Sequence, residues 1–193
     1  MGQIAAGLGV APGTVTAMMK TLSESGLVDY EPYSGVRLTA AGEKLAAHVL
    51  RRHRLIELFL VQVMELDWSH VHEEAERLEH AVSERLIERM DEMLGRPSVD
   101  PHGDPIPDAQ GFVDRHDFPD LLRCPVGRTM TVARVSDQSE EFLREAETRG
   151  LVPGSAVRVE KRDENERRVE LTVGEGRRFR LGYRSAAKVQ VKG

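Results

Sequence analysis

The chain has 193 residues, 40% of them apolar, with a formal net charge of −5 and one cysteine. This length and apolar content suffice for one or two ordinary hydrophobic cores. The single Cys124 excludes internal disulfides and multi-cysteine zinc sites, which fits a cytoplasmic protein in which this thiol fills apolar space. The longest apolar run, Leu58 to Val61, is too short to cross a bilayer, so we expect no membrane partner.

The first 26 residues have a helix-turn-helix pattern. Met1 to Leu8 predict a short helix, residues 9–12 a turn, and Pro12 the first turn of a second helix that runs to about Ser25. Gly26 is expected to end this helix in a left-handed conformation. The apolar residues that would form the shared core are Ile4, Ala5, Leu8, Val15, Met19 and Leu22.

A small hairpin and a set of longer helices are expected next. Residues 27–31 and 36–38 flank a turn and predict a wing beside the helix-turn-helix. Thr39 should begin a long, largely buried helix that ends near Glu65. Further helices are expected at about 70–82 and 84–94, and residues 96–116, rich in proline and acidic side chains, are expected to form an extended linker.

From Asp117 onward the pattern changes to short β-type runs with one helical insert at about Ser139 to Arg149. We expect a small β-barrel or curled sheet built from Thr129–Val135, Ala156–Lys161, Arg168–Val173, Arg177–Leu181 and Ala187–Val191. The predicted fold is therefore mainly α with a C-terminal β-barrel. Its predicted parts are a winged helix-turn-helix domain at 1–46, a helical domain with linker at 47–116, and a barrel at 117–193.

Six potential metal ligands occur at helical spacing in two stretches. His72, Glu76, Glu79 and His80 would project from one face of a single helix, beside an apolar stripe. On the preceding helix an apolar stripe runs through His53 and Glu57, so this pair is expected to be buried. The two stripes consist of Val71, Ala75, Leu78 and Val82, and of Ala46, Val49, Leu50, Ile56, Leu60 and Met64.

Charge is distributed unevenly along the chain. Residues 55–120 carry a net charge of −12, whereas residues 1–54 and 121–193 carry +2 and +5. Carboxylates gathered at a partly buried face repel one another unless a cation or protons neutralise them. The middle of the chain is thus expected to bind a divalent cation.

Three other interpretations stay open at this point. The acidic helix face can be an ordinary solvated surface, which is the commoner role of a His/Glu pair one helical turn apart. A metal-dependent hydrolase could use the His/Glu cluster around an activated water, although the chain lacks a His-Glu-x-x-His motif. A winged-helix regulator could instead bind an organic ligand, but its pocket would be apolar. Surface or capping roles are expected for His48, His70, His102 and His116.

Nearly the whole chain resembles the iron- and manganese-dependent repressors of the diphtheria toxin repressor and manganese transport regulator family. The C-terminal part resembles the Src homology 3-type barrel that three-domain members share with a ferrous-transport accessory protein. The motifs are Ile4-Ala5 with Leu8, Thr14-Val15-Thr16, Gly26-Leu27-Val28, Leu38-Thr39, Arg52-His53-Arg54-Leu55, His72-Glu73-Glu74-Ala75, Leu78-Glu79-His80, Pro101 to Pro107, Leu151 to Gly154 and Ala187 to Val191.

The resemblance implies two ion sites. His53, Glu57 and His72 would form the ancillary site, and Glu76, Glu79 and His80 would contribute to the primary one. Gln138 and Glu141 lie near the positions at which the barrel completes the ancillary site in three-domain relatives. Relatives also place another helix with a primary-site ligand before the helix-turn-helix, so we expect the chain to be truncated. Asp100, at a position that is often Cys in relatives, is expected to be linker variation.

The function implied is that of a homodimeric, metal-responsive transcriptional repressor that binds double-stranded operator DNA. Mn²⁺ or Fe²⁺ would be the co-repressor. Glu76 occupies a position where iron sensors often carry Cys and manganese sensors Glu, which favours Mn²⁺. Arg37 in the wing would contact the flanking phosphates. The second helix would contact DNA through Pro12, Gly13, Thr14, Thr16, Ala17 and Lys20.

Overall fold

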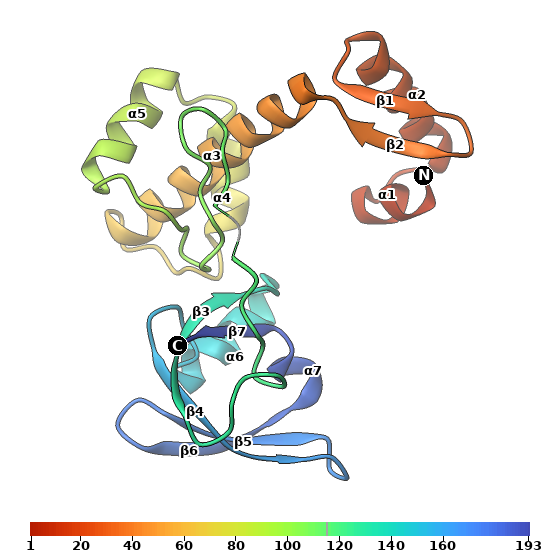
Figure 1. Ribbon diagram of the computed structural model, residues 1–193. Coiled ribbons are helices and arrows are strands. Elements are labelled where there is room, and N and C mark those ends of the chain that lie inside the picture. Colours follow the sequence, from red (N-terminus) through yellow and green to blue (C-terminus); the bar gives the residue numbers. More distant parts are fainter. Residues whose placement is uncertain (115) are drawn as a thin grey trace. The chain divides into compact units, whose positions relative to one another are not determined.

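The computed structural model describes residues 1–114 and 116–193 and divides the chain into two units. Unit 1 comprises Met1–Arg51 with Pro107–Phe112, and unit 2 comprises Arg52–Ile106 with Val113–Gly193. The long helix α3, Ala40–Gln62, contributes residues to both units (Figure 1). No helix in the described part of the chain is long and apolar enough to span a bilayer. The three domain limits given above stay a prediction.

Unit 1 contains the predicted helix-turn-helix and wing. Helix α1, Gly2–Leu8, is followed by α2, Pro12–Glu24, and by the antiparallel strands β1, Val28–Glu31, and β2, Gly35–Leu38 (Figure 1). Because apolar residues recur on one side of each helix, they pack together and leave the other sides to solvent. The fully buried members of this core are Ala5, Val15 and Met19.

Thr39 fixes the start of α3 against the end of α2. Its hydroxyl accepts a hydrogen bond from the Gly42 N–H at 3.1 Å and donates one to the Gly26 carbonyl at 2.7 Å. Gly26 has the left-handed φ of +71° that the sequence predicts after α2. A Cβ at Gly42 would lie 1.9 Å from the Leu27 carbonyl oxygen, so the chain passes close to the helix there. This capping interaction therefore determines the residue at which α3 begins.

The helical part of unit 2 consists of the C-terminal half of α3 with α4, Val71–Glu79, and α5, Glu84–Met93. The long helix ends at Gln62, before the predicted Glu65, which has a φ of +57°. The helix was predicted to be largely buried, but its apolar stripe is only partly buried. Val49 and Met64 are 49% and 58% exposed. The buried core consists of Leu55, Ile56, Leu58, Leu60, Val71, Ala75, Ile87 and Ile106.

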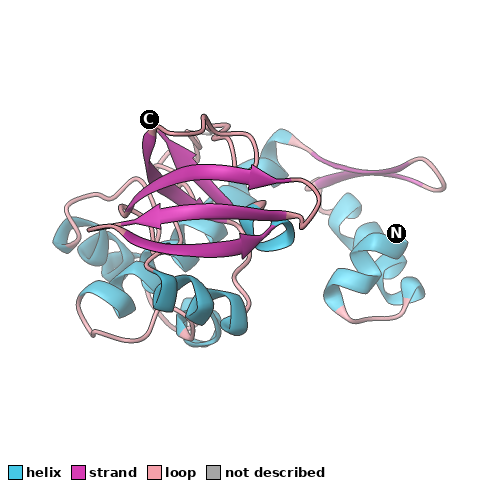
Figure 2. Cartoon of the chain, turned by 90° about the horizontal axis from the view of Figure 1, so that it is seen from below, coloured by secondary structure: helices cyan, strands magenta, loops and turns pink. Residues whose placement is uncertain are grey.

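The C-terminal part of unit 2 is an antiparallel sheet of β3, Thr129–Val135, β4, Ala156–Asp163, β5, Arg168–Val173, β6, Arg177–Gly182, and β7, Val189–Lys192. The strand order is β6-β5-β4-β3-β7, and Figure 2 shows the sheet in magenta. Register shifts in β3 and β4 let the sheet curl. Helix α6, Glu140–Arg149, packs Phe142, Leu143 and Ala146 into the hydrophobic core beside the sheet. Cys124 is buried in the same core and fills apolar space, as predicted. All five strands lie within two residues of their predicted bounds. The short helix α7, Tyr183–Ala186, was not predicted.

The predicted extended linker is wrong for residues 98–106. Val99 and Pro105 form an antiparallel bridge, and Asp100, His102 and Asp104 are buried. The carboxylate of Asp100 accepts backbone hydrogen bonds from His102 and Asp104, which closes a tight turn. The His102 carbonyl accepts a hydrogen bond from the Val135 N–H at 2.8 Å, so the turn packs against β3. The surface role expected for His102 and the linker role expected for Asp100 are therefore both wrong.

Gly103 is the position where this turn depends most on the absence of a side chain. Its φ is +87°, and a Cβ there would lie 2.0 Å from the Ala133 carbonyl oxygen. Gly154 has a similar φ of +91° but open space around it. Gly154→Ala should cost about 1–2 kcal/mol from backbone strain alone, and Gly103→Ala at least about 3 kcal/mol because β3 must also move. Urea unfolding in chelator tests this, and equal costs for the two variants would show that the close approach is absent.

Candidate metal centre

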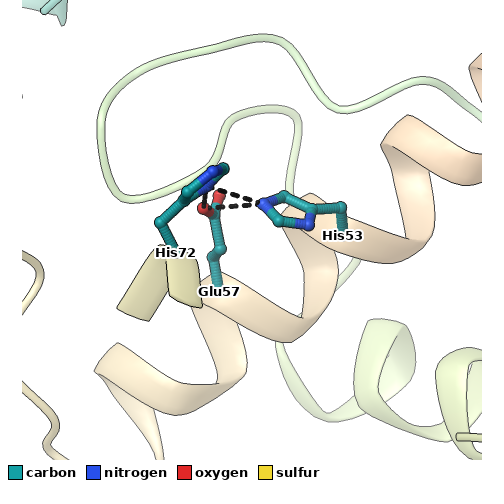
Figure 3. Close-up of side chains that lie close together, drawn as sticks. All are labelled: His53, Glu57 and His72. Carbon is teal, nitrogen blue, oxygen red and sulfur yellow. Dashed lines mark hydrogen bonds and ion pairs between the residues drawn. The ribbon is translucent and has the colours of Figure 1, made fainter. Parts of the chain in front are cut away.

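The close approach of α3 and α4 brings two histidines and one carboxylate to a single point. His53 Nε2 lies 3.0 Å from both Glu57 Oε1 and His72 Nδ1, and His72 Nδ1 lies 3.1 Å from Glu57 Oε1 (Figure 3). His53 and Glu57 are one helical turn apart on α3, whereas His72 follows the start of α4. The side chain of Glu57 is 2% exposed and that of His72 51%, so the group has a buried floor and an open side.

Glu79 determines which nitrogen of His53 faces this group. Its Oε2 lies 2.9 Å from His53 Nδ1, and an ionised carboxylate can only accept a hydrogen bond. Nδ1 therefore carries a proton in either state of the ring. When the ring is protonated, Nε2 donates to Glu57 Oε1, and when it is neutral, Nε2 has a lone pair that a cation can use. A carboxylate behind a ligating imidazole is a recurring arrangement that fixes the ring and raises its basicity.

Hydrogen bonds and charges within the group shift the pKa values of His53 and Glu57 in opposite directions. Burial lowers the pKa of His53, but hydrogen bonds and charge from Glu57 and Glu79 outweigh it and leave that pKa above its ordinary value. Burial raises the pKa of Glu57, yet hydrogen bonds and charge from His53, with a hydrogen bond from His72, leave it below the ordinary value. A cation bound by these atoms would take the place of the proton on His53 Nε2.

The other predicted ligands lie at different distances from this group. Glu76 Oε1 lies 3.5 Å from His72 Nε2 and His80 Nε2 lies 3.6 Å from Glu79 Oε1, so both flank the group with exposed side chains. Gln138 instead donates a hydrogen bond to Asp104 Oδ2 at 2.8 Å. Glu141 is exposed on α6, and within residues 1–114 and 116–193 it makes no hydrogen bond or ion pair with His53, Glu57 or His72. The structure thus brings four of the predicted ligands into direct contact.

A second group of potential ligands also contains Glu57. We call His53, Glu57 and His72 the upper group, and Glu57, Asp100 and His102 the lower group. Asp100 and His102 each place a ligand atom within 4.8 Å of Glu57, and all three residues are buried. Burial, with the charges of Asp104 and Glu57, raises the pKa of Asp100 to about 7. Helical spacing could not reveal these two residues because they come from the turn at 98–106. The signal that could have found them is their separation in the sequence, since Asp100 and His102 lie on either side of Pro101.

The predicted DNA-contacting residues lie on the outer side of unit 1. Val15 and Met19 of α2 face the core, so Pro12, Gly13, Thr14, Ala17 and Lys20 are exposed and Thr16 is half-buried. Arg37 is exposed on β2. These positions leave the N-terminal turns of α2 and the wing accessible to a partner.

The donor set fits a divalent transition-metal ion. Two imidazole nitrogens and one carboxylate oxygen are the ligands that Mn²⁺, Fe²⁺ and Zn²⁺ share. The mutual separations of about 3 Å are close to those between adjacent ligands of one such ion. The half-exposed His72 leaves a side from which an ion can enter.

Comparison with known proteins agrees with this geometry. Residues 39–108 match the family model described as iron dependent repressor, metal binding and dimerisation domain, residues 1–36 match the N-terminal DNA binding domain of the same repressors, and residues 120–193 match the FeoA domain. The iron-dependent repressor IdeR of Mycobacterium leprae (strain TN) is 33% identical over 163 residues, which cover 76% of this chain and 69% of that protein.

Solved structures extend the likeness to nearly the full chain. A manganese-dependent transcriptional repressor in complex with manganese is 40% identical, with a TM-score of 0.88 over 98% of this chain and 88% of its own. The apo form of the manganese-activated repressor ScaR is 34% identical, with a TM-score of 0.80 over 98% and 90%. These matches give no support to the hydrolase interpretation. The chain belongs to the iron-dependent repressor family.

Proposed function

We propose that this chain represses transcription when Mn²⁺ binds to His53, Glu57 and His72, with Glu76, Glu79 and His80 completing the ion sites. Family membership makes the protein a metal-dependent, DNA-binding repressor with Mn²⁺ or Fe²⁺ as co-repressor. The observation that carries the residue assignment is the convergence of His53 Nε2, Glu57 Oε1 and His72 Nδ1 within 3.1 Å. We further propose that the protein acts in the cytoplasm, where its operator DNA lies.

Helix α3 supports a direct connection between metal and DNA. It carries His53 and Glu57 in unit 2, and its first turn is capped by Thr39 in unit 1. An ion held by α3 and α4 together favours whichever conformation brings these donors closest, since a ligand shifts an equilibrium only by its differential affinity. We propose that this conformation sets the spacing of the two α2 helices in a homodimer on a palindromic operator.

Exposed apolar side chains support the dimer. The end of α3 and helix α5 expose Val63, Met64, Leu86 and Met93, which are each between 46% and 58% accessible. These residues lie within the stretch that matches the metal-binding and dimerisation model. We therefore place the dimer contact on this helical part of unit 2.

Manganese is the proposed ion because of Glu76. Affinity alone follows the Irving–Williams order and disfavours Mn²⁺, so selectivity must come from ligand type and geometry. Glu76 places a hard carboxylate 3.5 Å from His72 Nε2, and its side chain is 62% exposed. Softer or later ions would gain from a thiolate at this position.

His53→Gln should weaken Mn²⁺ binding by more than about tenfold, because it removes a ligand whose ring is already oriented by Glu79. His48→Gln is the matched control, since His48 is exposed on the same helix. Isothermal titration with Mn²⁺ measures both affinities. DNA fragments selected for binding in Mn²⁺ then report function: chelator should release them from the wild type, and unchanged binding in chelator would contradict metal-dependent repression.

Lys20→Ala should weaken binding of those DNA fragments at every sequence and reduce the slope of log affinity against log salt by about 1. The reason is that an exposed lysine on α2 is expected to neutralise one phosphate. Lys161→Ala, an exposed lysine on β4, is the control for the loss of one positive charge. Fluorescence anisotropy at several salt concentrations gives the slopes, and identical slopes for the two variants would remove Lys20 from the interface.

Glu76→Cys should shift activation away from Mn²⁺ and toward Fe²⁺ or Co²⁺, because a thiolate replaces a hard oxygen donor. Glu73→Cys is the matched control and should leave the ranking of ions unchanged. It places a thiol on the same helix, at a residue whose partner is Arg77 at 3.9 Å. DNA binding across a panel of free metal concentrations ranks the ions for each protein. If Fe²⁺ activates the wild type at far lower concentration than Mn²⁺ and Glu76→Cys keeps that ranking, the manganese assignment is wrong.

A further inference from the structure

The group formed by Glu57, Asp100 and His102 differs from the half-open group above it. These three residues are 1%, 3% and 1% exposed, and each offers a ligand atom within 4.8 Å of the others. Glu57 belongs to both groups, so they share one carboxylate (Figure 3 shows its position beside His53 and His72).

His102 has one tautomer that its surroundings allow when the ring is neutral. Its Nε2 lies 3.0 Å from the Trp68 carbonyl oxygen, which can only accept, so Nε2 carries the proton. Nδ1 then presents a lone pair, has no hydrogen-bond partner, and lies 3.9 Å from Asp100 Oδ1. A buried lone pair therefore lies near a carboxylate oxygen and has no hydrogen-bond donor as its partner.

Asp100 is also incompletely satisfied. Its Oδ1 accepts hydrogen bonds from the backbone N–H groups of His102 and Asp104, at 2.8 and 2.9 Å. Its Oδ2 is buried without a hydrogen bond and has only the Arg54 Nε at 3.5 Å. Burying polar atoms without partners is costly, which indicates that this group takes up something further.

Charge around the group points the same way. Three buried carboxylates, from Glu57, Asp100 and Asp104, face two guanidinium groups, from Arg54 and Arg134. Arg134 and Arg54 both reach Asp104, and Arg54 also lies 3.5 Å from Asp100 Oδ2, so with the neighbouring histidines neutral these groups together keep a net charge of −1. Uncompensated buried charge must be neutralised by a cation or by a proton.

We propose that Glu57, Asp100 and His102 form a buried site for a second divalent cation of the first transition row. Two carboxylates and a neutral imidazole cancel the charge of such an ion and supply the mixed oxygen and nitrogen donors it prefers. The ligand atoms of the three residues lie within 4.8 Å of one another, and Asp100 Oδ2 and His102 Nδ1 have no hydrogen-bond partner that an ion would have to displace. The inference depends on the proposed function only in that Glu57 is shared.

The test is a crystal structure of the full chain grown with excess Mn²⁺, with anomalous diffraction recorded at the manganese edge. The expected result is a peak within bonding distance of Glu57, Asp100 and His102, in addition to one beside His53 and His72. A peak at the upper group alone would overturn the inference and leave the proposed function intact, with a water or a proton filling the lower group. Absence of both peaks would overturn both.

Variants give an independent count of bound ions by equilibrium dialysis. Asp100→Asn keeps an oxygen for the two backbone N–H groups but removes the charge, and His102→Gln removes the nitrogen donor. Each should lose one Mn²⁺ per chain, whereas His116→Gln, an exposed histidine paired with Asp114 at 3.1 Å, should lose none. If Asp100→Asn folds and binds as many ions as the wild type, the proposed site does not exist. The wild-type diffraction result decides the question even where a variant fails to fold.

Discussion

Much of this structure depends on how one buried carboxylate, that of Glu57, is neutralised. Glu57 is 1% exposed and lies among Leu55, Ile56 and Leu58, where an unpaired negative charge would cost several kcal/mol. Hydrogen bonds from His53 and His72 reverse the effect of burial and hold its pKa below the ordinary value. Since His72 belongs to α4, neutralising Glu57 also ties α4 to α3. The same three side chains therefore hold the helices together and present metal donors.

Glu79 links the two ion sites that the sequence separates. The resemblance places Glu79 at the primary site and His53 at the ancillary one, yet the two side chains share a 2.9 Å hydrogen bond. Any ligand that draws Glu79 away from His53 Nδ1 also releases the ring that presents Nε2 to Glu57 and His72. Arg52 restricts this movement, because its Nε donates to the Glu79 carbonyl at 2.6 Å. In the proposed arrangement, a single hydrogen bond thus connects a ligand of one ion site to a ligand of the other.

Local sequence patterns predicted the helices, the wing and the strand positions, because these depend on residues near in sequence. The grouping of His72 with His53 and Glu57, which lie on another helix, came from the family resemblance. His53 and Glu57 share a helical turn, and Thr39 caps the residue three positions ahead. The turn at 98–106 was missed because its burial comes from distant β3, through the Val135 N–H and the space beside Ala133. Locally, proline and aspartate at these positions have the composition of a solvated linker. Gln138 was likewise placed by its partner Asp104 rather than by its own neighbours.

The placement of the donors limits how an ion can act on DNA binding. Every donor of the upper group comes from α3 or α4, and none comes from α1, α2 or the wing. In the proposed function an ion would therefore not contact the predicted DNA-binding residues, and its differential affinity would act on α3, α4 and the residues that pack against them. Helix α3 is the element that enters both units, and Thr39 and Gly42 fix its first turn against the end of α2. Under the proposed function, α3 is therefore the element through which metal binding would act on the helix-turn-helix.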